Sequence, residues 1–306
     1  MIREFRPGDA EAVSTILHAD VVPHAVTPAG VRHWLEAQPE RARARMFVAE
    51  EEGEIVGWAE SRLTWATRAP GVGDFWAYIA PRARGRGLGR ALYEQVEAHL
   101  VGVGARVLQT WTHNEAGLAL LENRGFRATG TERISVLDLA GADVSSLPTL
   151  EQEKTGEGFR LVTLRDAVDD LEALHRVYTA AAADVPEYFT EDDVRLEEWR
   201  RETLEHPQLA YEGSFVVLAG EQPVALAFLE VDGAAGLAAN EMTGTLPEFR
   251  RRGLARLAKL ATIRWALAQG LSRVLTGNAE ANVGMLRLNE SLGYRPVLTE
   301  THLVRE

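Results

Sequence analysis

Two arginine- and glycine-rich segments of this sequence have the spacing of a phosphate-binding loop. They are Pro81-x-x-Arg84-Gly85-Arg86-Gly87-Leu88-Gly89-Arg90 and Pro247-x-x-Arg250-Arg251-Arg252-Gly253-Leu254-Ala255-Arg256. Each follows a strand-like segment and precedes a helix-like one, where backbone N–H groups without intrahelical partners can bind an anion. Glycine lets the backbone approach a phosphate closely, and arginine adds charged hydrogen bonds. The two segments therefore predict pyrophosphate recognition.

The spacing within these segments excludes two common phosphate motifs and favours a third. No Gly-x-x-x-x-Gly-Lys-Ser/Thr run occurs, and Arg90 stands where a Gly-x-Gly-x-x-Gly fingerprint would need its third glycine. The remaining Arg-x-x-Gly-x-Gly/Ala pattern resembles the coenzyme A pyrophosphate loop of the GNAT superfamily of acyl-CoA-dependent N-acyltransferases. One copy would fit an exposed, arginine-rich helix start equally well, but two copies in matching contexts favour a coenzyme site.

Two further pairs of matching residues indicate that the whole sequence is duplicated. Asn114 and Asn282 each stand eleven positions before a Gly-aromatic pair, and Asp20 and Asp184 each begin a similar Asp-Val-containing segment. The three pairs are offset by 164, 166 and 168 residues, which is the size of a domain. Each Asn suits a helix N-cap, and the resemblance implies that it also contacts the pantetheine arm.

The elements that must position these motifs follow from hydrophobic patterning. In the first copy we expect strands at 2–6, 46–50, 55–63, 75–79, 106–112 and 134–139, and helices at 10–19, 29–38, 88–101 and 115–123. This order predicts an α/β fold of two tandem GNAT-like domains, each a mixed, largely antiparallel sheet flanked by helices. We expect the first domain at 1–140, an irregular polar linker at 141–158 and the second domain at 159–306.

Composition limits the classes of function. The sequence has 306 residues, no cysteine and a formal net charge of −12, which argues against nucleic acid as the main partner and allows a cationic substrate. No apolar run is long enough to span a membrane, and the first residues do not resemble a signal peptide. The histidines have no metal-ligand spacing. We therefore expect a cytoplasmic protein without a metal, as a monomer or homodimer.

An acid in the second copy is suited to deprotonating an amine. On a regular strand Glu241 shares one face with Thr243 and Thr245, directly before the coenzyme loop, and many GNAT enzymes carry their general base at this place. The alternative is a solvent-exposed acid at the start of a strand. In the first copy the nearest acid, Asp74, is one residue out of phase. The second copy is therefore predicted to be the catalytic one.

The general acid of the family is missing from both copies. The resemblance places a tyrosine four residues before the Gly-aromatic pair, where this sequence has Leu121 and Asn289. Asn289 can donate a hydrogen bond to a sulfur atom but cannot protonate it. Water and Tyr188 remain alternatives, so the proton donor stays unassigned.

Acceptor contacts in the family come from the loop between the first two helices. Here these are Asp184, Glu187 and Tyr188 in the second copy, with Asp20 and His24 in the first. Two acids could hold an ammonium group, although both aspartates also suit ordinary turns. Four tryptophans, at positions 58, 65, 76 and 111, are interpreted as core or sheet packing.

The resemblance assigns the remaining site residues. Predicted coenzyme contacts in the second copy are Thr245, Leu246, Arg250, Arg251, Arg252, Gly253, Leu254, Ala255, Arg256, Asn278 and Asn282. Those in the first copy are Ile79, Ala80, Arg84, Gly85, Arg86, Gly87, Leu88, Gly89, Arg90 and Asn114. The implied activity is acetyl transfer from acetyl-CoA to a primary amine of a small molecule, by direct attack. Alternatives are a non-catalytic acyl-CoA sensor and a protein lysine acetyltransferase. The first copy could bind acyl-CoA, be vestigial or complete the acceptor cleft.

Overall fold

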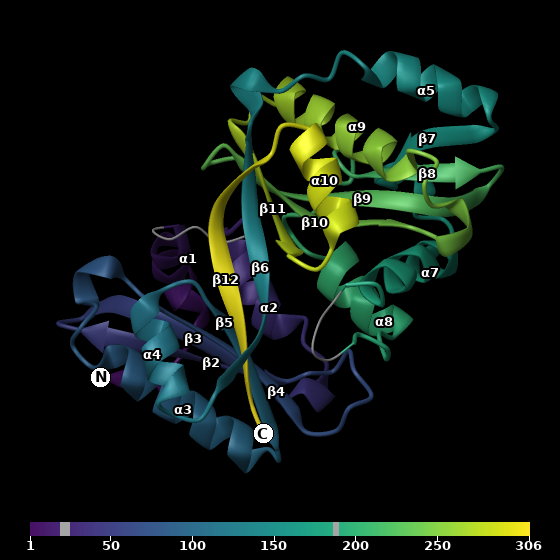
Figure 1. Cartoon of the computed structure of the whole chain (residues 1–306). Coiled ribbons are helices and arrows are strands. Elements are labelled where there is room, and N and C mark those ends of the chain that lie inside the picture. Colours follow the sequence, from purple (N-terminus) through teal and green to yellow (C-terminus); the bar gives the residue numbers. More distant parts are fainter. Residues whose placement is uncertain (19–24, 186–189) are drawn as a thin grey trace.

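A computed structural model of the chain describes residues 1–18, 25–185 and 190–306. Its strands form one twelve-stranded sheet in the order β1-β2-β3-β4-β5-β12-β6-β11-β10-β9-β8-β7. Figure 1 shows the two repeats at opposite ends of this sheet, with the long strands β6 and β12 between them. The mixed sheet with flanking helices confirms the predicted α/β fold of two tandem units.

The elements of the first repeat lie within a few residues of the predicted ranges, except that β6 begins at Arg127 and not at 134. The strands are β1 (Ile2–Glu4), β2 (Arg45–Glu51), β3 (Glu54–Leu63), β4 (Val72–Ile79), β5 (Val107–Thr112) and β6 (Arg127–Asp138). The helices are α1 (Ala10–His18), α2 (Pro28–Glu36), α3 (Leu88–Gly102) and α4 (Glu115–Glu122). Thr27 caps α2 and Asn114 caps α4, each by accepting from a backbone N–H three residues on.

The second repeat follows the same order. Its strands are β7 (Phe159–Thr163), β8 (Phe215–Ala219), β9 (Gln222–Asp232), β10 (Leu237–Thr245), β11 (Arg273–Ala279) and β12 (Arg295–Arg305). Its helices are α6 (Leu164–Ala167), α7 (Leu171–Ala182), α8 (Leu196–Trp199), α9 (Leu254–Ala268) and α10 (Val283–Ser291). Matching elements along both halves support the duplication that the three residue pairs indicated.

Residues 141–158 were expected to be irregular, and this expectation is wrong. Residues 147–156 form helix α5 (Leu147–Gly156), which packs against α9 and β7. Leu147 is fully buried and Leu150 packs on the same core, whereas the remaining positions are mostly polar. Two leucines on a short helix give too little hydrophobic periodicity for the helix to be predicted from the sequence.

The two repeats exchange their last strands. β6, which ends the first repeat, pairs with β11 of the second, from Asp138 opposite Arg273 to Glu132 opposite Ala279. β12, which ends the chain, pairs with β5 of the first repeat and with β6. A division of the sequence at 141–158 therefore separates the repeats along the chain but not within the sheet.

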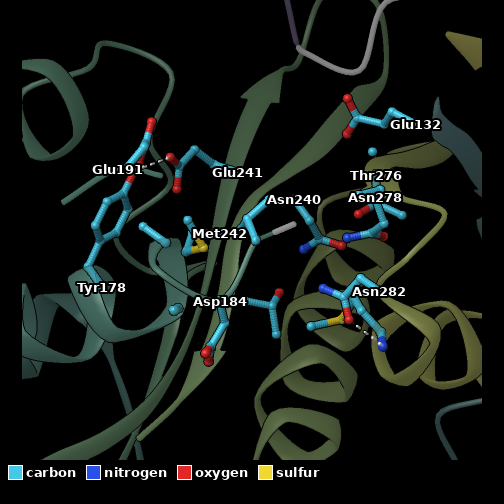
Figure 2. A pocket seen from close by; sticks show the side chains of 18 of the residues that line it. Glu132, Tyr178, Asp184, Glu191, Asn240, Glu241, Met242, Thr276, Asn278 and Asn282 are labelled. Atoms are coloured by element: carbon cyan, nitrogen blue, oxygen red, sulfur yellow. Dashed lines mark hydrogen bonds between the residues drawn. The ribbon is translucent and has the colours of Figure 1, made fainter. Parts of the chain in front are cut away.

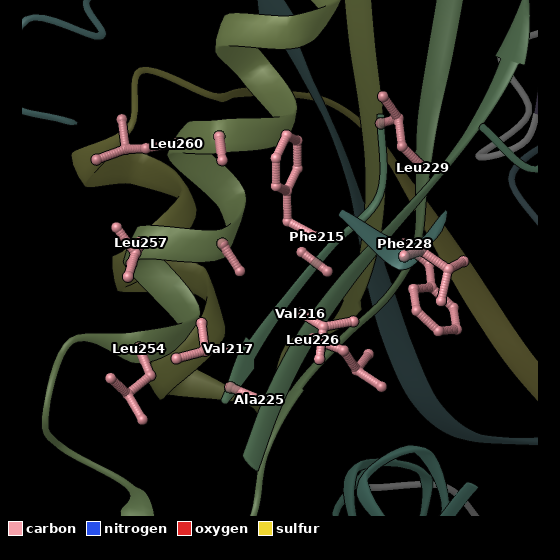
Figure 3. Packing of buried hydrophobic residues seen from close by; sticks show 14 of the residues in the cluster. Phe215, Val216, Val217, Ala225, Leu226, Phe228, Leu229, Leu254, Leu257 and Leu260 are labelled. Carbon is pink, nitrogen blue, oxygen red and sulfur yellow. The ribbon is translucent and has the colours of Figure 1, made fainter. Parts of the chain in front are cut away.

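The largest core surrounds β8 and β9, which are covered by helices on both faces. Phe215 and Val217 of β8 face α9, whereas Val216 faces the opposite side together with Leu226 and Phe228 (Figure 3). Leu254, Leu257 and Leu260 project from the other side of α9 and belong to the same buried cluster (Figure 3). Each fully buried leucine stabilises the fold by about 2 kcal/mol relative to an exposed one. This core holds α9 and the loop before it in place.

Candidate active site

The parallel strands β10 and β11 are paired with each other only at their beginnings. Residues 237–239 of β10 pair with residues 273–275 of β11. Beyond these residues the two strands continue to Thr245 and Ala279 without pairing to each other. A cavity of about 1010 Å³ is lined by this unpaired stretch and extends to the first repeat. Figure 2 shows Asn240 and Glu241 of β10 opposite Thr276 and Asn278 of β11 around it. Unpaired strand edges beside a cavity offer backbone hydrogen-bonding groups to a ligand.

The two predicted coenzyme loops have the same backbone shape. Gly87 and Gly253 precede α3 and α9 with φ of 82° and 79°, and neither helix start has a side-chain cap. Two residues earlier, Gly85 and Arg251 are also left-handed, with φ of 77° and 60°. In both loops the first arginine donates from Nε to a strand carbonyl, Ile79 O at 3.0 Å and Thr245 O at 3.1 Å. Both loops thus present uncapped helix N–H groups.

Only the second loop lines the described cavity. Its lining residues from the predicted set are Thr245, Arg250, Arg251, Gly253, Leu254, Ala255, Arg256, Asn278 and Asn282. Leu246 instead lies in the core, and the Arg252 guanidinium lies over the rings of Phe159 and Phe249. In the first repeat, neither the loop at 84–90 nor its neighbours Ile79, Ala80 and Asn114 are among the lining residues. Arg86 there forms an ion pair with Glu51.

A β-bulge in β10 overturns the expected strand phase. The register with β9 shifts between Asn240 and Thr243, so two residues of β10 lie opposite Phe228 alone. Glu241 accordingly faces α7, where the Tyr178 hydroxyl donates to its Oε1 at 3.2 Å. Gly244 also faces α7, because a Cβ there would lie 2.2 Å from the Ala181 Cβ. Glu241 therefore does not share a face with Thr243 and Thr245, although all three line the cavity.

The first repeat has no such bulge in its equivalent strand. The pairing of β3 with β4 runs without a shift from Gly57 opposite Ile79 to Leu63 opposite Gly73. Asp74 at the start of β4 is buried and accepts from Gln109 Nε2 at 2.6 Å and from Thr64 Oγ1 at 2.5 Å. Both Asp74 and Glu241 nevertheless line the same cavity between the repeats.

Carboxylates are concentrated on this cavity, and burial raises the pKa values of Glu230 and Glu241. Burial raises the pKa of Glu230 to about 8, with the charge of Glu202 adding to the effect. Burial and the carboxylate of Glu230 raise the pKa of Glu241 well above its usual range. Oε2 of Glu241 is buried without a hydrogen-bond partner among the described residues. A carboxylate with a free lone pair and a raised pKa is suited to accepting a proton.

Further buried acids lie on the exchanged strands that line the cavity and, in the first repeat, beside the lining residue Arg62. Burial raises the pKa of Glu60, on β3, to about 7 and that of Glu132, on β6, to about 7, the latter helped by Glu300 of β12. Arg62 is the cation among them, 3.5 Å from Glu60 and 3.6 Å from Glu202. The part of the cavity wall near the first repeat is therefore predominantly acidic.

Three of the four tryptophans assigned to packing also line the cavity. Trp58 is 3% exposed and lies in the core, as expected. Trp65, Trp76 and Trp111 line the cavity, and the last two stack with an interplanar angle of 4° and centroids 5.8 Å apart. The alternation of β4 held a signal for this, since Trp76 is out of phase with its buried neighbour Phe75.

The predicted acceptor loop is only partly described. Glu187 and Tyr188 lie outside the described residues, as do Asp20 and His24. Asp184 lines the cavity and forms an ion pair with Arg250. This ion pair ties Asp184 to the coenzyme loop.

Asn289 is buried and does not line the cavity directly. It accepts a hydrogen bond from Lys259 Nζ at 2.7 Å and donates one to Asn278 Oδ1 at 2.6 Å. Lys259 and Asn278 both line the cavity. Sequence reasoning missed Lys259, which lies five residues beyond the helix start in a pattern typical of an amphipathic helix. Leu121, the equivalent of Asn289 in the first repeat, lies in the apolar core.

Two kinds of site are absent from the part of the chain that the structure describes. Within residues 1–18, 25–185 and 190–306, no group of three or more His, Asp or Glu side chains is arranged to hold a metal ion. None of the helices in these ranges combines the length and apolar character of a membrane span.

Known proteins resemble both halves of the chain. The family model described as "Acetyltransferase (GNAT) family" matches residues 14–126 and 171–294. A mycothiol acetyltransferase from Thermobispora bispora is 28% identical over 299 residues, covering 96% of this chain and 94% of the relative. Another, from Nocardioides sp., is 26% identical and covers 95% of each chain.

Solved structures share the fold over the full length. A tandem GNAT protein from the clavulanic acid biosynthesis pathway superposes with a TM-score of 0.74 at 18% identity, covering 100% of this chain and 98% of its own. A GCN5-related N-acetyltransferase from Sphaerobacter thermophilus gives a TM-score of 0.68, also at 18% identity, covering 100% and 95%.

Proposed function

Because the chain belongs to the acetyltransferase (GNAT) family, whose members use acetyl-CoA, we propose that its second repeat acetylates a primary amine of a small molecule. The observation that carries this proposal is the continuity of one cavity. It runs from the uncapped start of α9 past Glu241 to the stacked tryptophans of the first repeat. A coenzyme and an acceptor can therefore meet at the bulge of β10.

Unpartnered polar atoms support binding of the coenzyme along β10. Asn240 Nδ2 and Thr243 Oγ1 are buried without a hydrogen-bond partner among the described residues, and both side chains line the cavity. Unsatisfied buried polar groups are costly, so a ligand that bonds to them gains affinity. In our proposal the N–H groups of residues 254–256 hold the pyrophosphate, and Arg250, Arg251 and Arg256 surround it.

Glu241 is proposed as the general base. Acetyl-CoA supplies an acetyl group activated as a thioester. The acceptor enters as an ammonium ion, whose positive charge favours the ionised form of the nearby carboxylate and offsets its raised pKa. Glu241 then takes the ammonium proton through its unpartnered Oε2, and the neutral amine can attack.

The acidic wall supports a cationic acceptor of small size. Asp74 and Glu230 line the cavity and are more than nine-tenths buried, so a molecule reaches them by entering the cavity between the repeats. The relatives named mycothiol acetyltransferase also favour a small-molecule acceptor over a protein lysine. Of the three roles left open for the first repeat, we favour completion of the acceptor cleft, because Trp76 and Trp111 form one of its walls.

Thiol release from acetyl-CoA, measured with a panel of small amines and di-amines, tests this function. We expect turnover with cationic amines, and a loss of turnover in Glu241→Gln. Tight acetyl-CoA binding with no turnover on any amine would favour the non-catalytic sensor. Turnover with lysine peptides but no small amine would favour protein acetylation.

A further inference from the structure

Lysine is almost absent from this chain. Of the 33 basic Lys and Arg residues only Lys154 and Lys259 are lysines. Lys154 lies on α5 and bonds to the carboxylates of Glu153 and Glu157. Lys259 lies on α9, is 1% exposed and lines the cavity. The chain thus places an amine that can lose its proton at a buried position, where an arginine would remain charged.

No carboxylate compensates the charge of Lys259 within the described residues. Its Nζ donates to the neutral Asn289 and lies 5.1 Å from the centre of the Tyr294 ring. Burial lowers the pKa of Lys259 to about 7. A buried ammonium ion held only by an amide and a ring is costly to the fold. Such a cost is typical of a residue that is retained for chemistry.

The residues that contact Lys259 form hydrogen bonds at the place where β10 and β11 separate. Asn289, which accepts from Lys259, donates a hydrogen bond to Asn278 of β11. The Tyr294 hydroxyl donates to Asn240 Oδ1 of β10 at 2.8 Å. Asn240 directly follows the last residue of β10 that pairs with β11. The network therefore occupies the fork of the two strands, on the sheet face opposite to Glu241.

We propose that Lys259 donates the proton to the sulfur atom that leaves coenzyme A, the role that Asn289 cannot fill. This inference rests on the proposed function. The amine nitrogen bonds to the acetyl carbon, the carbon–sulfur bond breaks and its electron pair stays on sulfur. Lys259 gives a proton to that sulfur, the product departs as a thiol, and solvent returns a proton to the lysine. Asn289 and Asn278 hold the ammonium group in position.

Among the described residues, no ion pair joins Lys259 to another charged group. On its own helix Arg256 bonds to Ser291, and on α10 Glu290 pairs with Arg133. On β6, the carboxylate of Glu132 lies beside Gly277 of β11. Glu230 and Glu241 lie on the α7 face of the sheet. Tyr294 has its pKa raised by burial and stays neutral. The ammonium fraction of Lys259 therefore falls as the pH rises through about 7.

The scarcity of lysine allows a direct test. Protein labelled with ¹⁵N/¹³C-lysine gives two side-chain signals, which Lys154→Met assigns. We expect the Lys259 signal to titrate near pH 7, without any substrate, whereas hydrogen bonds to Glu153 and Glu157 raise the pKa of Lys154. Titration of Lys259 above pH 9 would overturn the proposal. This readout is independent of turnover, so it separates a failure of this inference from a failure of the proposed function.

Kinetics on an accepted amine completes the test. We expect Lys259→Met to lose about 10²-fold or more in kcat, with acetyl-CoA affinity within about threefold of wild type. Lys259→Arg should keep its positive charge at every pH tested, so its kcat should not decrease above pH 7 as that of the wild type does. Lys154→Met is the matched control and should match wild type. A kcat of Lys259→Met within twofold of wild type, or an unchanged pH profile in Lys259→Arg, would contradict the proposal.

Discussion

The hydroxyl of Tyr178 lies 3.2 Å from Oε1 of Glu241 and donates a hydrogen bond to it. This contact joins α7 to the bulged part of β10, and the second carboxylate oxygen of Glu241 has no hydrogen-bond partner within residues 1–18, 25–185 and 190–306. It also opposes the effects of burial and of Glu230, because a hydrogen bond to the carboxylate lowers its pKa. Tyr178 therefore helps Glu241 to ionise.

Removal of this hydroxyl should shift the pH dependence. In Tyr178→Phe the pKa of Glu241 rises further, so the ascending limb of kcat/KM moves to higher pH and activity at pH 7 falls. The loss should shrink as the pH rises, because the carboxylate then ionises in both proteins. Tyr211→Phe is the control, since its hydroxyl bonds to Leu204 O and Tyr211 does not line the cavity. Parallel profiles for wild type and Tyr178→Phe would contradict this role.

The left-handed glycine before α9 should be required for coenzyme binding. Gly253→Val forces a β-branched residue into a φ of 79° and disturbs the N–H groups that follow. We expect acetyl-CoA affinity to fall at least tenfold by calorimetry. Gly87→Val is the matched control, because Gly87 has the same conformation but lies in the other loop. An equal loss of affinity in both variants would show that the second loop is not the principal site.

The stacked tryptophans should act on the acceptor and not on the coenzyme. In Trp76→Ala we expect the KM for the amine to rise about tenfold, while the Kd for acetyl-CoA stays within twofold. Trp58→Ala, in the core, should instead lower stability by about 3–5 kcal/mol. An unchanged KM for every accepted amine in Trp76→Ala would remove the first repeat from the acceptor cleft.

The strand exchange can be tested by disulfide formation, because the chain has no cysteine of its own. Thr112 of β5 lies opposite Thr301 of β12, so Thr112→Cys combined with Thr301→Cys should oxidise to an intramolecular disulfide. Arg133 of β6 occupies the equivalent position in the first repeat, and Thr112→Cys with Arg133→Cys should keep both thiols free. Thiol titration and mass spectrometry distinguish the two outcomes. Cross-linking of the control pair instead of the first would refute the exchange.

The sequence predicted the order of elements and the two loops well, because strands, helix starts and glycine-rich turns are local features. It could not predict the exchange of β6 and β12, since the two strands occupy equivalent positions in the repeats and either can complete either half of the sheet. The phase of Glu241 was wrong for a similar reason, because one extra residue in β10 reverses the faces on either side of it. The role of Lys259 was missed because its burial against Asn289 depends on how helix α9 packs against helix α10, which is not a local feature of the sequence.

The activity of Glu241→Gln on an identified amine, compared with wild type between pH 6 and 9, tests the central claim most directly. The substitution keeps the shape of the side chain and should leave acetyl-CoA binding unchanged. We expect kcat/KM to fall about 10²-fold or more at pH 7, with a smaller loss at pH 9, where more of the amine is already neutral. Asp74→Asn, which lines the same cavity, should have a much smaller effect. Full turnover by Glu241→Gln across this pH range would contradict the assignment of the base, and a greater loss in Asp74→Asn would place catalysis in the first repeat.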